Sequence, residues 1–129
     1  MAMKKKRILC VEEHEDTCAL ISKVLENYEI KSAKSKSEAL IHATKDKFDL
    51  YLLNYHLPDG DGLELSLLIK NFDPEAPILF VTGTNYITER QALMVGAEGL
   101  LRIDSASFLV DLEKKVSKLF EAQASWETI

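Results

Sequence analysis

The chain has 129 residues, close to the most common length of a single domain and long enough to close a hydrophobic core without disulfides or a structural metal ion. Its 47% hydrophobic and 29% charged residues are typical of an ordinary soluble globular protein. The formal net charge of −5 argues against nucleic acid as a direct ligand, because phosphate backbones are bound by lysine and arginine.

Short apolar runs alternate with longer helical patterns five times along the chain. The first run, residues 8–11, ends in acidic residues and is followed by apolar residues at helical spacing over 19–25. A half-polar strand at 30–33 precedes a second helix at 37–43. Further strands are predicted at 50–53, 77–82 and 100–101, and further helices at 63–69, 92–95 and 108–120, with Gly96 ending the fourth helix and a short polar tail beginning at about Gln123.

Strands this continuously apolar indicate a parallel sheet that is covered on both faces. With right-handed crossovers, the alternation gives an α/β doubly wound sheet, and such sheets carry their functional groups at the carboxyl ends of the strands. These ends hold Glu12 and Glu13, then Asn54, then Thr82, then Ile103. We therefore expect the functional site to draw on these five residues.

Several other functions find no support in the sequence. The glycines of a dinucleotide-binding turn are replaced by Glu-Glu-His-Glu at 12–15, and we expect no enzyme activity. The chain has no run of about 18 apolar residues and no apolar leader segment, which predicts a cytoplasmic protein that does not enter the membrane. Cys10 and Cys18 have the spacing of neither a redox pair nor a zinc site, so we predict two reduced thiols.

Five segments together resemble the receiver domain of two-component response regulators. These segments are ILCVEE at 8–13, DLYLLN at 49–54, LPDGDGLEL at 57–65, PILFVTG at 77–83 and ALMVGAEG at 92–99. The resemblance covers about residues 7–121, so residues 1–129 are expected to form a single receiver-like domain. It implies a flavodoxin-like five-stranded parallel sheet of order 2-1-3-4-5 and a role as a switch in phosphorelay signalling.

The resemblance also assigns a role to the first three strand-end residues. In this family an acidic pair after the first strand and an aspartate at the end of the third strand hold Mg²⁺, and that aspartate accepts a phosphoryl group from a histidine kinase. Glu12 and Glu13 stand at the acidic pair, and Asn54 stands at the phosphoacceptor. An amide nitrogen is not a comparable nucleophile, because its lone pair is delocalised into the carbonyl. The lost negative charge should also weaken the metal site, so Mg²⁺ at Glu13 and Asn54 is expected to bind weakly or not at all.

Three more positions of the family switch are matched by this chain. Thr82 matches the hydroxyl residue that follows the phosphoryl group, Ile103 stands where a lysine would pair with it, and Leu100 stands where an aromatic residue is usual. Asp104 replaces the proline that normally follows the lysine. Ile103 cannot offset the charge of a phosphoryl group, and Leu100 cannot swing a polar-tipped ring. The nucleophile, the positive charge that pairs with the phosphoryl group and the aromatic switch residue are therefore all absent, at Asn54, Ile103 and Leu100.

The favoured prediction is a pseudo-receiver, which takes part in two-component signal transduction without being phosphorylated and acts by binding a protein partner. The family implies that a histidine kinase or an output protein binds the face made by the fourth helix, the fifth strand and the fifth helix. A homodimer through the last helix is a further alternative, although one face of that helix must cover the sheet.

A different class of function would use the histidines near the acidic pair. His14 and His56 should lie near Glu12 and Glu13 at the carboxyl edge of the sheet. A site of imidazole and carboxylate groups suits Zn²⁺ or Mn²⁺. This pattern gives the alternative of a metal-sensing or small-ligand-sensing module. Two exposed loop histidines in an acidic patch are the simpler interpretation.

A last alternative keeps phosphorylation but moves it to a neighbouring carboxylate. Asp59 and Asp61 lie close in sequence to Asn54. Both sit on the turn that follows the third strand and should point away from the acidic pair, so geometry argues against this alternative.

Overall fold

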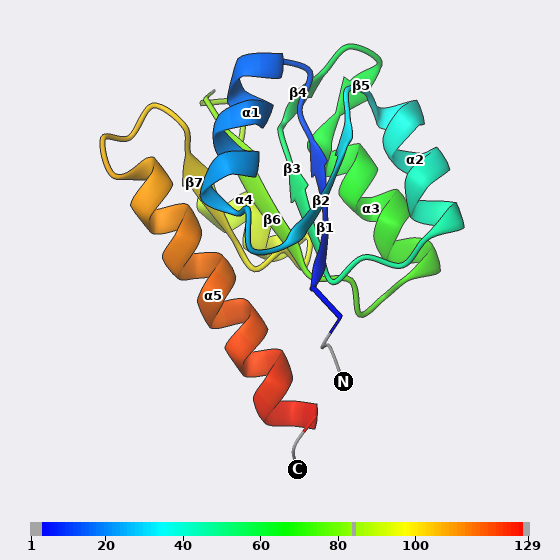
Figure 1. Cartoon of the computed structure of the whole chain (residues 1–129). Coiled ribbons are helices and arrows are strands. Elements are labelled where there is room, and N and C mark those ends of the chain that lie inside the picture. The colour runs from blue at the N-terminus through cyan, green and yellow to red at the C-terminus, as the bar shows by residue number, and fades with distance from the viewer. Residues whose placement is uncertain (1–3, 84, 128–129) are drawn as a thin grey trace.

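The computed structural model describes residues 4–83 and 85–127. In this part of the chain, five parallel strands form one sheet of order β2-β1-β3-β6-β7 (Figure 1). The strands are β1 (Arg7–Val11), β2 (Glu29–Ala33), β3 (Leu50–Leu53), β6 (Ile78–Thr82) and β7 (Gly99–Arg102). Counting only these five in chain order gives 2-1-3-4-5, which confirms the predicted flavodoxin-like sheet.

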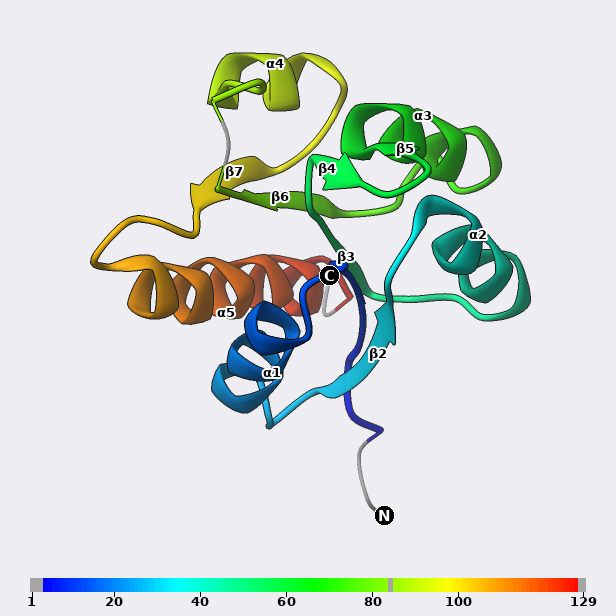
Figure 2. The ribbon, with the colours of Figure 1, turned by 90° about the horizontal axis from the view of Figure 1, so that it is seen from above.

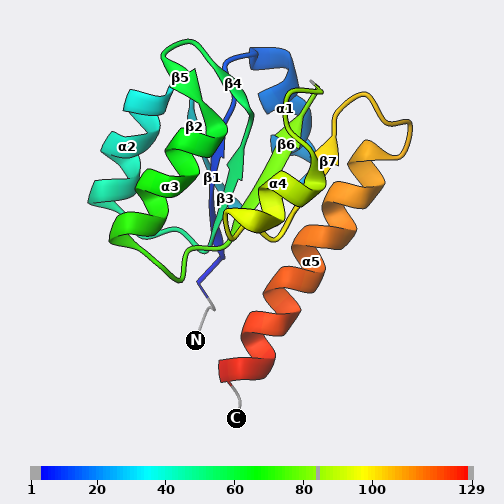
Figure 3. The ribbon, with the colours of Figure 1, turned by 180° about the vertical axis from the view of Figure 1, so that it is seen from behind.

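Helices cover both faces of the sheet. Their bounds are α1 (Glu15–Val24), α2 (Lys36–Lys45), α3 (Gly62–Phe72), α4 (Glu89–Met94) and α5 (Phe108–Glu127). Seen from above, α1 and α5 lie on one side of the strands, and α2, α3 and α4 lie on the other (Figure 2). The view from behind shows α3 and α4 in front of the sheet (Figure 3). The molecule is thus a three-layer α/β sandwich, as a doubly wound sheet requires.

The continuous apolar runs of the strands are explained by two separate hydrophobic cores. Successive side chains of a strand point to opposite faces, so Leu9 and Val11 pack under α2 and α3, while Ile8 and Cys10 pack under α1 and α5. In β3 all four residues from Leu50 to Leu53 are buried. A strand with both faces covered must be apolar at every position, which is the pattern the sequence shows.

The end of α4 follows its local sequence closely. Thr88 and Gln91 form a capping box at the start of the helix. At the other end, Gly96 has φ of 87° and Ala97 donates its backbone N–H to the carbonyl of Ala92 at 3.0 Å. This is a Schellman motif, which needs a glycine because other residues rarely adopt positive φ. The predicted helix end at Gly96 is confirmed.

Two features differ from the sequence-based prediction. The turn after β3 is a small hairpin, in which β4 (His56–Leu57) pairs antiparallel with β5 (Gly60–Asp61). The last helix is longer than the pattern predicted over 108–120, because α5 continues to Glu127 and includes part of the polar tail that begins at about Gln123. No helix breaker interrupts this segment, and Gln123 donates its side-chain amide to the backbone carbonyl of Asp49 at 3.2 Å, which holds the helix against the sheet. Among the described residues, no helix combines the length and the apolar character that crossing a membrane requires.

Candidate functional site

The backbone brings Glu12 and Asn54 together at the carboxyl edge of the sheet. The Asn54 N–H donates to the carbonyl of Val11 at 3.0 Å, and the Glu12 N–H donates to the carbonyl of Ala33 at 2.9 Å. These bonds continue the strand pairing one residue past β1 and β3. Both side chains are buried, with 3% of Glu12 and 7% of Asn54 exposed. Burial of two polar side chains needs a compensating interaction.

That interaction is a direct hydrogen bond between the two side chains. The Asn54 Nδ2 donates to Glu12 Oε2 at 2.9 Å. A hydrogen bond to an ionised acceptor is about twice as strong as one between neutral groups. The amide therefore stabilises the buried carboxylate in a place where an aspartate would repel it. The other end of the amide, Asn54 Oδ1, is buried and has no hydrogen-bond partner in the described part of the chain.

Glu12 and Glu13, the two residues of the acidic pair, differ in their contacts and in their burial. Glu12 Oε2 also accepts from the backbone N–H of His14 at 3.3 Å and lies 3.3 Å from His14 Nδ1. Glu13 is only half-buried. The Glu12 carboxylate is thus fixed by an amide and a histidine, while Glu13 is more exposed than Glu12.

The two histidines predicted to lie near the acidic pair have different neighbours. His14 is exposed beside Glu12, whereas His56 is exposed within an aromatic cluster. The His56 ring lies 5.6 Å from Tyr55 and 5.4 Å from Tyr86, edge to face in both cases. Within residues 4–83 and 85–127, no group of three or more histidine, cysteine or acidic side chains is placed to hold a metal ion. The arrangement gives no support to the zinc or manganese alternative.

The oxygen donors at this edge also fit Mg²⁺ poorly. Mg²⁺ demands near-ideal octahedral geometry and is usually bound through one or two carboxylates. Of the candidate ligands, Glu12 Oε2 already accepts the Asn54 amide, and Asn54 Oδ1 contributes no charge. Of the two glutamates, Glu12 is thus held by Asn54 and by the backbone of His14, and Glu13 remains as the main carboxylate for a metal ion.

Thr82, Leu100 and Ile103, the three switch positions, have different surroundings. Thr82 is fully buried at the end of β6, and its carbonyl accepts the backbone N–H of Ile103 at 2.9 Å. The Ile103 side chain is half-buried and packs against the core under α1 and α5, whereas the half-buried Leu100 packs against the core on the other face of the sheet. The residue at the lysine position therefore contacts a hydrophobic core.

A cation at this edge was missed by the sequence analysis. Arg102, which is opposite Thr82 in the register of β6 and β7, donates from Nε to Asp104 Oδ1 at 3.1 Å and from Nη2 to Asp104 Oδ2 at 3.2 Å. The guanidinium holds the pKa of the Asp104 carboxyl below its usual value. The pair spans the turn that follows β7, in which the Ser105 N–H donates to the carbonyl of Arg102 at 3.2 Å.

Asp59 and Asp61 serve as helix caps. Asp59 accepts the backbone N–H groups of Lys36 at 2.7 Å and Ser37 at 2.9 Å, which are at the start of α2. These two bonds keep the pKa of Asp59 below its ordinary value of 3.8. Asp61 is the N-cap of α3 and accepts the N–H of Glu64 at 2.8 Å. Both carboxylates are used to satisfy helix N-termini, which weakens the alternative of phosphorylation at these residues.

Gly62 allows α3 to approach the site. A Cβ at this position would lie 2.3 Å from the backbone carbonyl oxygen of Asn54 and 3.0 Å from the Phe80 ring. Its N–H donates to the carbonyl of Tyr55 at 2.7 Å. The Gly-Asp-Gly segment thus positions a helix against residue 54, in agreement with its interpretation as a turn into that helix.

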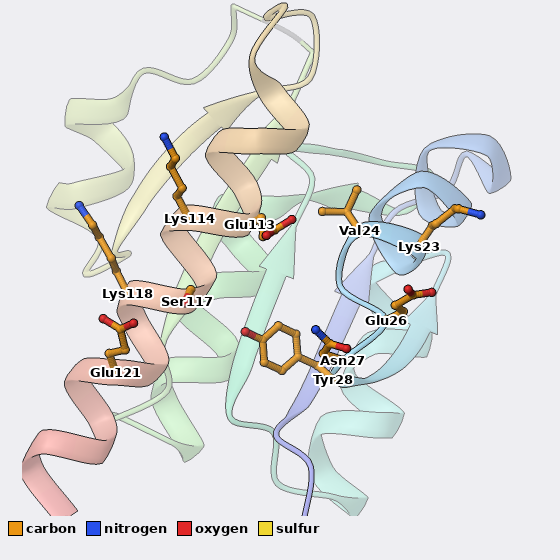
Figure 4. A pocket seen from close by; sticks show the side chains of 10 residues that line it. All are labelled: Lys23, Val24, Glu26, Asn27, Tyr28, Glu113, Lys114, Ser117, Lys118 and Glu121. Atoms are coloured by element: carbon orange, nitrogen blue, oxygen red, sulfur yellow. The ribbon is translucent and has the colours of Figure 1, made fainter.

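An open pocket lies away from the carboxyl edge of the sheet. It measures about 740 Å³ and is formed by the C-terminal part of α1, the loop that follows it and α5 (Figure 4). Its lining mixes three lysines with three glutamates and includes the ring of Tyr28, which packs edge to face against Phe120 with ring centroids 5.0 Å apart. None of the predicted site residues lines it.

Comparison with known proteins agrees with the fold. Residues 8–105 match the family model described as the response regulator receiver domain. The response regulator protein PilR of Pseudomonas aeruginosa is 32% identical over 98 residues, which are 74% of this chain and 22% of PilR. The chain therefore spans about a fifth of the length of that relative.

Solved structures of receiver proteins superpose over most of the chain. A two-component response regulator from Clostridium difficile has 28% identity and a TM-score of 0.82, covering 91% of this chain and 97% of the other. The non-phosphorylated HemR receiver domain from Leptospira biflexa has 30% identity and a TM-score of 0.80, covering 89% and 94%.

Proposed function

We propose that this chain, which belongs to the response regulator receiver domain family, transmits a two-component signal without accepting a phosphoryl group at residue 54. The observation that carries the proposal is the hydrogen bond of 2.9 Å between Asn54 Nδ2 and Glu12 Oε2. It puts a neutral donor where phosphorylation needs an ionised oxygen.

The chemistry of residue 54 supports this proposal in two ways. The Asn54 carboxamide is too weak a nucleophile to attack a phosphoryl group, because its nitrogen lone pair is delocalised into the carbonyl. The same group donates a hydrogen bond to the buried Glu12 side chain, which is therefore stabilised without a metal ion. We propose accordingly that Mg²⁺ binds weakly or not at all and that the domain catalyses no phosphoryl transfer.

The switch positions support a domain held in one conformation. A phosphoryl-responsive switch needs an element that differs between two states and a ligand that favours one of them. Ile103 and Leu100 are each packed against a core, on opposite faces of the sheet. Neither can sense a charge at residue 54. The proposed domain therefore acts through its shape or responds to another input.

The proposed partner is a protein, either a histidine kinase or an output protein, that binds the face formed by α4, β7 and α5. Exposed apolar side chains on this side support the proposal: Leu93 is 51% and Met94 is 76% exposed on α4. The apolar stripe of α5 is less available, since Phe108, Leu112 and Val116 are buried in the core. A homodimer would have to use other residues of that helix.

The experiment is incubation of the chain with Mg²⁺ and acetyl phosphate, followed by measurement of the intact mass. The expected result is no added phosphoryl mass. An adduct would refute the proposal, and repeating the incubation with Asp59→Asn and Asp61→Asn would then show whether one of these caps had accepted the group. An adduct that survives in both variants would locate the acceptor elsewhere on the chain.

A further inference from the structure

Cys10 and Cys18 lie at the same hydrophobic core, although their spacing in the sequence suggested no relation. Cys10 is in β1 and is 1% exposed, with its side chain in the core under α1 and α5. Cys18 is on α1 and packs against the same core. Cys10 is opposite Ser32 in the register of β1 and β2, and the Cys18 Sγ lies 3.1 Å from Ser32 Oγ, so the two thiols lie beside the same serine. The eight-residue separation spans the turn between strand and helix, which folds the helix back over the strand.

The two thiols differ in their access to solvent. Cys18 is half-buried and lines a cavity of about 280 Å³ together with Glu12, Ser22, Ser32 and Lys34. Its Sγ lies 3.1 Å from Ser32 Oγ on the exposed edge strand β2. Cys10 does not line this cavity. A small reagent in the cavity can therefore reach Cys18 but not the buried Cys10.

We propose that Cys10 and Cys18 form an oxidant-sensitive thiol pair, in which a hydroperoxide oxidises Cys18 and Cys10 then closes a disulfide between β1 and α1. The Cys18 thiolate attacks the outer oxygen of the hydroperoxide, which breaks the O–O bond. This step gives a sulfenic acid, and the leaving alkoxide or hydroxide takes up a proton. The Cys10 sulfur then attacks the Cys18 sulfur, the S–S bond forms, and the Cys10 proton leaves with the hydroxyl group as water.

The hydrogen bonds of the pair suit these separate roles. The thiol of Cys10 and the hydroxyls of Ser32 and Ser22 stabilise a negative charge on Cys18 and lower its pKa to about 6. The same contact with Cys18, together with burial, raises the pKa of Cys10. The exposed member is thus the attacking thiolate, and the buried member stays protonated until a sulfenic acid forms beside it.

The position of the pair connects it to the acidic edge. Glu12 lines the cavity of Cys18 and follows β1 directly, two residues after Cys10. A disulfide requires the two sulfurs to approach to about 2.05 Å, much closer than a hydrogen bond. Closing it would draw α1 toward β1 and pull Cys18 away from Ser32. The residues at the start of α1, Glu15 and Asp16, would shift with the helix.

The test is treatment of the reduced chain with hydrogen peroxide near neutral pH, followed by intact mass and non-reducing peptide mapping. The chain has only two cysteines, so an intramolecular disulfide must join this pair. The expected result is a loss of two hydrogens in the monomer and a cross-linked peptide containing Cys10 and Cys18. A disulfide-linked dimer, an overoxidised Cys18 without a disulfide, or no reaction would each overturn the proposal.

Two variants and a trapping reagent distinguish the steps. In Cys10→Ala, which keeps a small apolar side chain in the core, dimedone should trap a sulfenic acid on Cys18, and no monomeric disulfide should appear. In Cys18→Ser, Cys10 should stay reduced under the same treatment. Ser32→Ala, an exposed change outside the core, should slow the oxidation of Cys18, because a hydrogen bond to its thiolate is lost. Oxidation of Cys10 in Cys18→Ser would contradict the assigned order.

Discussion

Replacing Asn54 with aspartate should destabilise the folded chain at neutral pH, although the two side chains have nearly the same shape. In the native chain Asn54 Nδ2 donates to Glu12 Oε2 at 2.9 Å, and the two residues are 7% and 3% exposed. Asn54→Asp removes this donor and puts two carboxylates in contact. A hydrogen bond to a charged group contributes about 1.5 to 3 kcal/mol.

The repulsion between the carboxylates adds to this loss. At a separation of about 4 Å and an effective dielectric constant of about 20, two unit charges interact by about 4 kcal/mol. Protonation relieves part of the repulsion, since the pKa of the introduced carboxyl rises, and each unit of rise costs about 1.4 kcal/mol at a pH above it. A rise of about two units, with the lost hydrogen bond, gives a net destabilisation of about 4 to 6 kcal/mol at about pH 7.

The assay is urea unfolding of both chains in the presence of a chelator at about pH 7 and about pH 5. A raised carboxyl pKa in the folded state is favourable only at low pH, so the destabilisation should grow as the pH rises from 5 to 7. Excess Mg²⁺ should restore part of the loss in Asn54→Asp and have little effect on the native chain. Asn27→Asp, an exposed turn residue, is the matched control and should change stability little. Equal stability of Asn54→Asp and the native chain at neutral pH would show that the Asn54–Glu12 hydrogen bond does not stabilise the fold.

Three other perturbations test the surroundings of the site. Gly62→Ala should destabilise the chain by about 1 to 3 kcal/mol in urea unfolding, because its Cβ would overlap the Asn54 carbonyl oxygen at 2.3 Å, and an unchanged midpoint would contradict this packing. Leu112→Ala, in the fully buried face of α5, should cost about 2 to 5 kcal/mol, and a loss under about 1 kcal/mol would show that α5 does not pack as described. Asp59→Ala should lower the thermal midpoint near neutral pH through loss of the α2 cap. Because the pKa of Asp59 is depressed in the folded chain, this difference should be fully present above the ordinary value of 3.8 and vanish as the pH falls below it, and a pH-independent difference would argue against the cap.

The sequence predicts the sheet well because its information is local. Each residue of β3 is apolar, and a continuous apolar run is enough to indicate a strand buried on both faces. The strand ends then follow from topology, which is why Glu12 and Asn54 could be placed at one edge before their contact was known. Their hydrogen bond, however, depends on side-chain conformations that residue order does not determine.

The missed features depend on contacts that are distant in sequence or on the rotation of a helix. Asp59 caps a helix that starts more than twenty residues earlier, at Lys36, and no local pattern encodes such a pairing. Cys10 and Cys18 lie at the same core because α1 turns one particular face toward β1. The sequence places Ile103 at the lysine position, but that its side chain packs against the core under α1 and α5 depends on contacts that residue order does not determine.

The most direct test of the central claim is a phosphoryl-donor assay on the native chain beside Asn54→Asp combined with Ile103→Lys. Both proteins would be incubated with Mg²⁺ and acetyl phosphate, and the fraction carrying a phosphoryl group would be measured by mass. We expect no phosphoryl group on the native chain. We expect Mg²⁺-dependent phosphorylation of the double variant, at the residue introduced at position 54. A phosphoryl group on the native chain, at a level comparable with the double variant, would contradict the central claim.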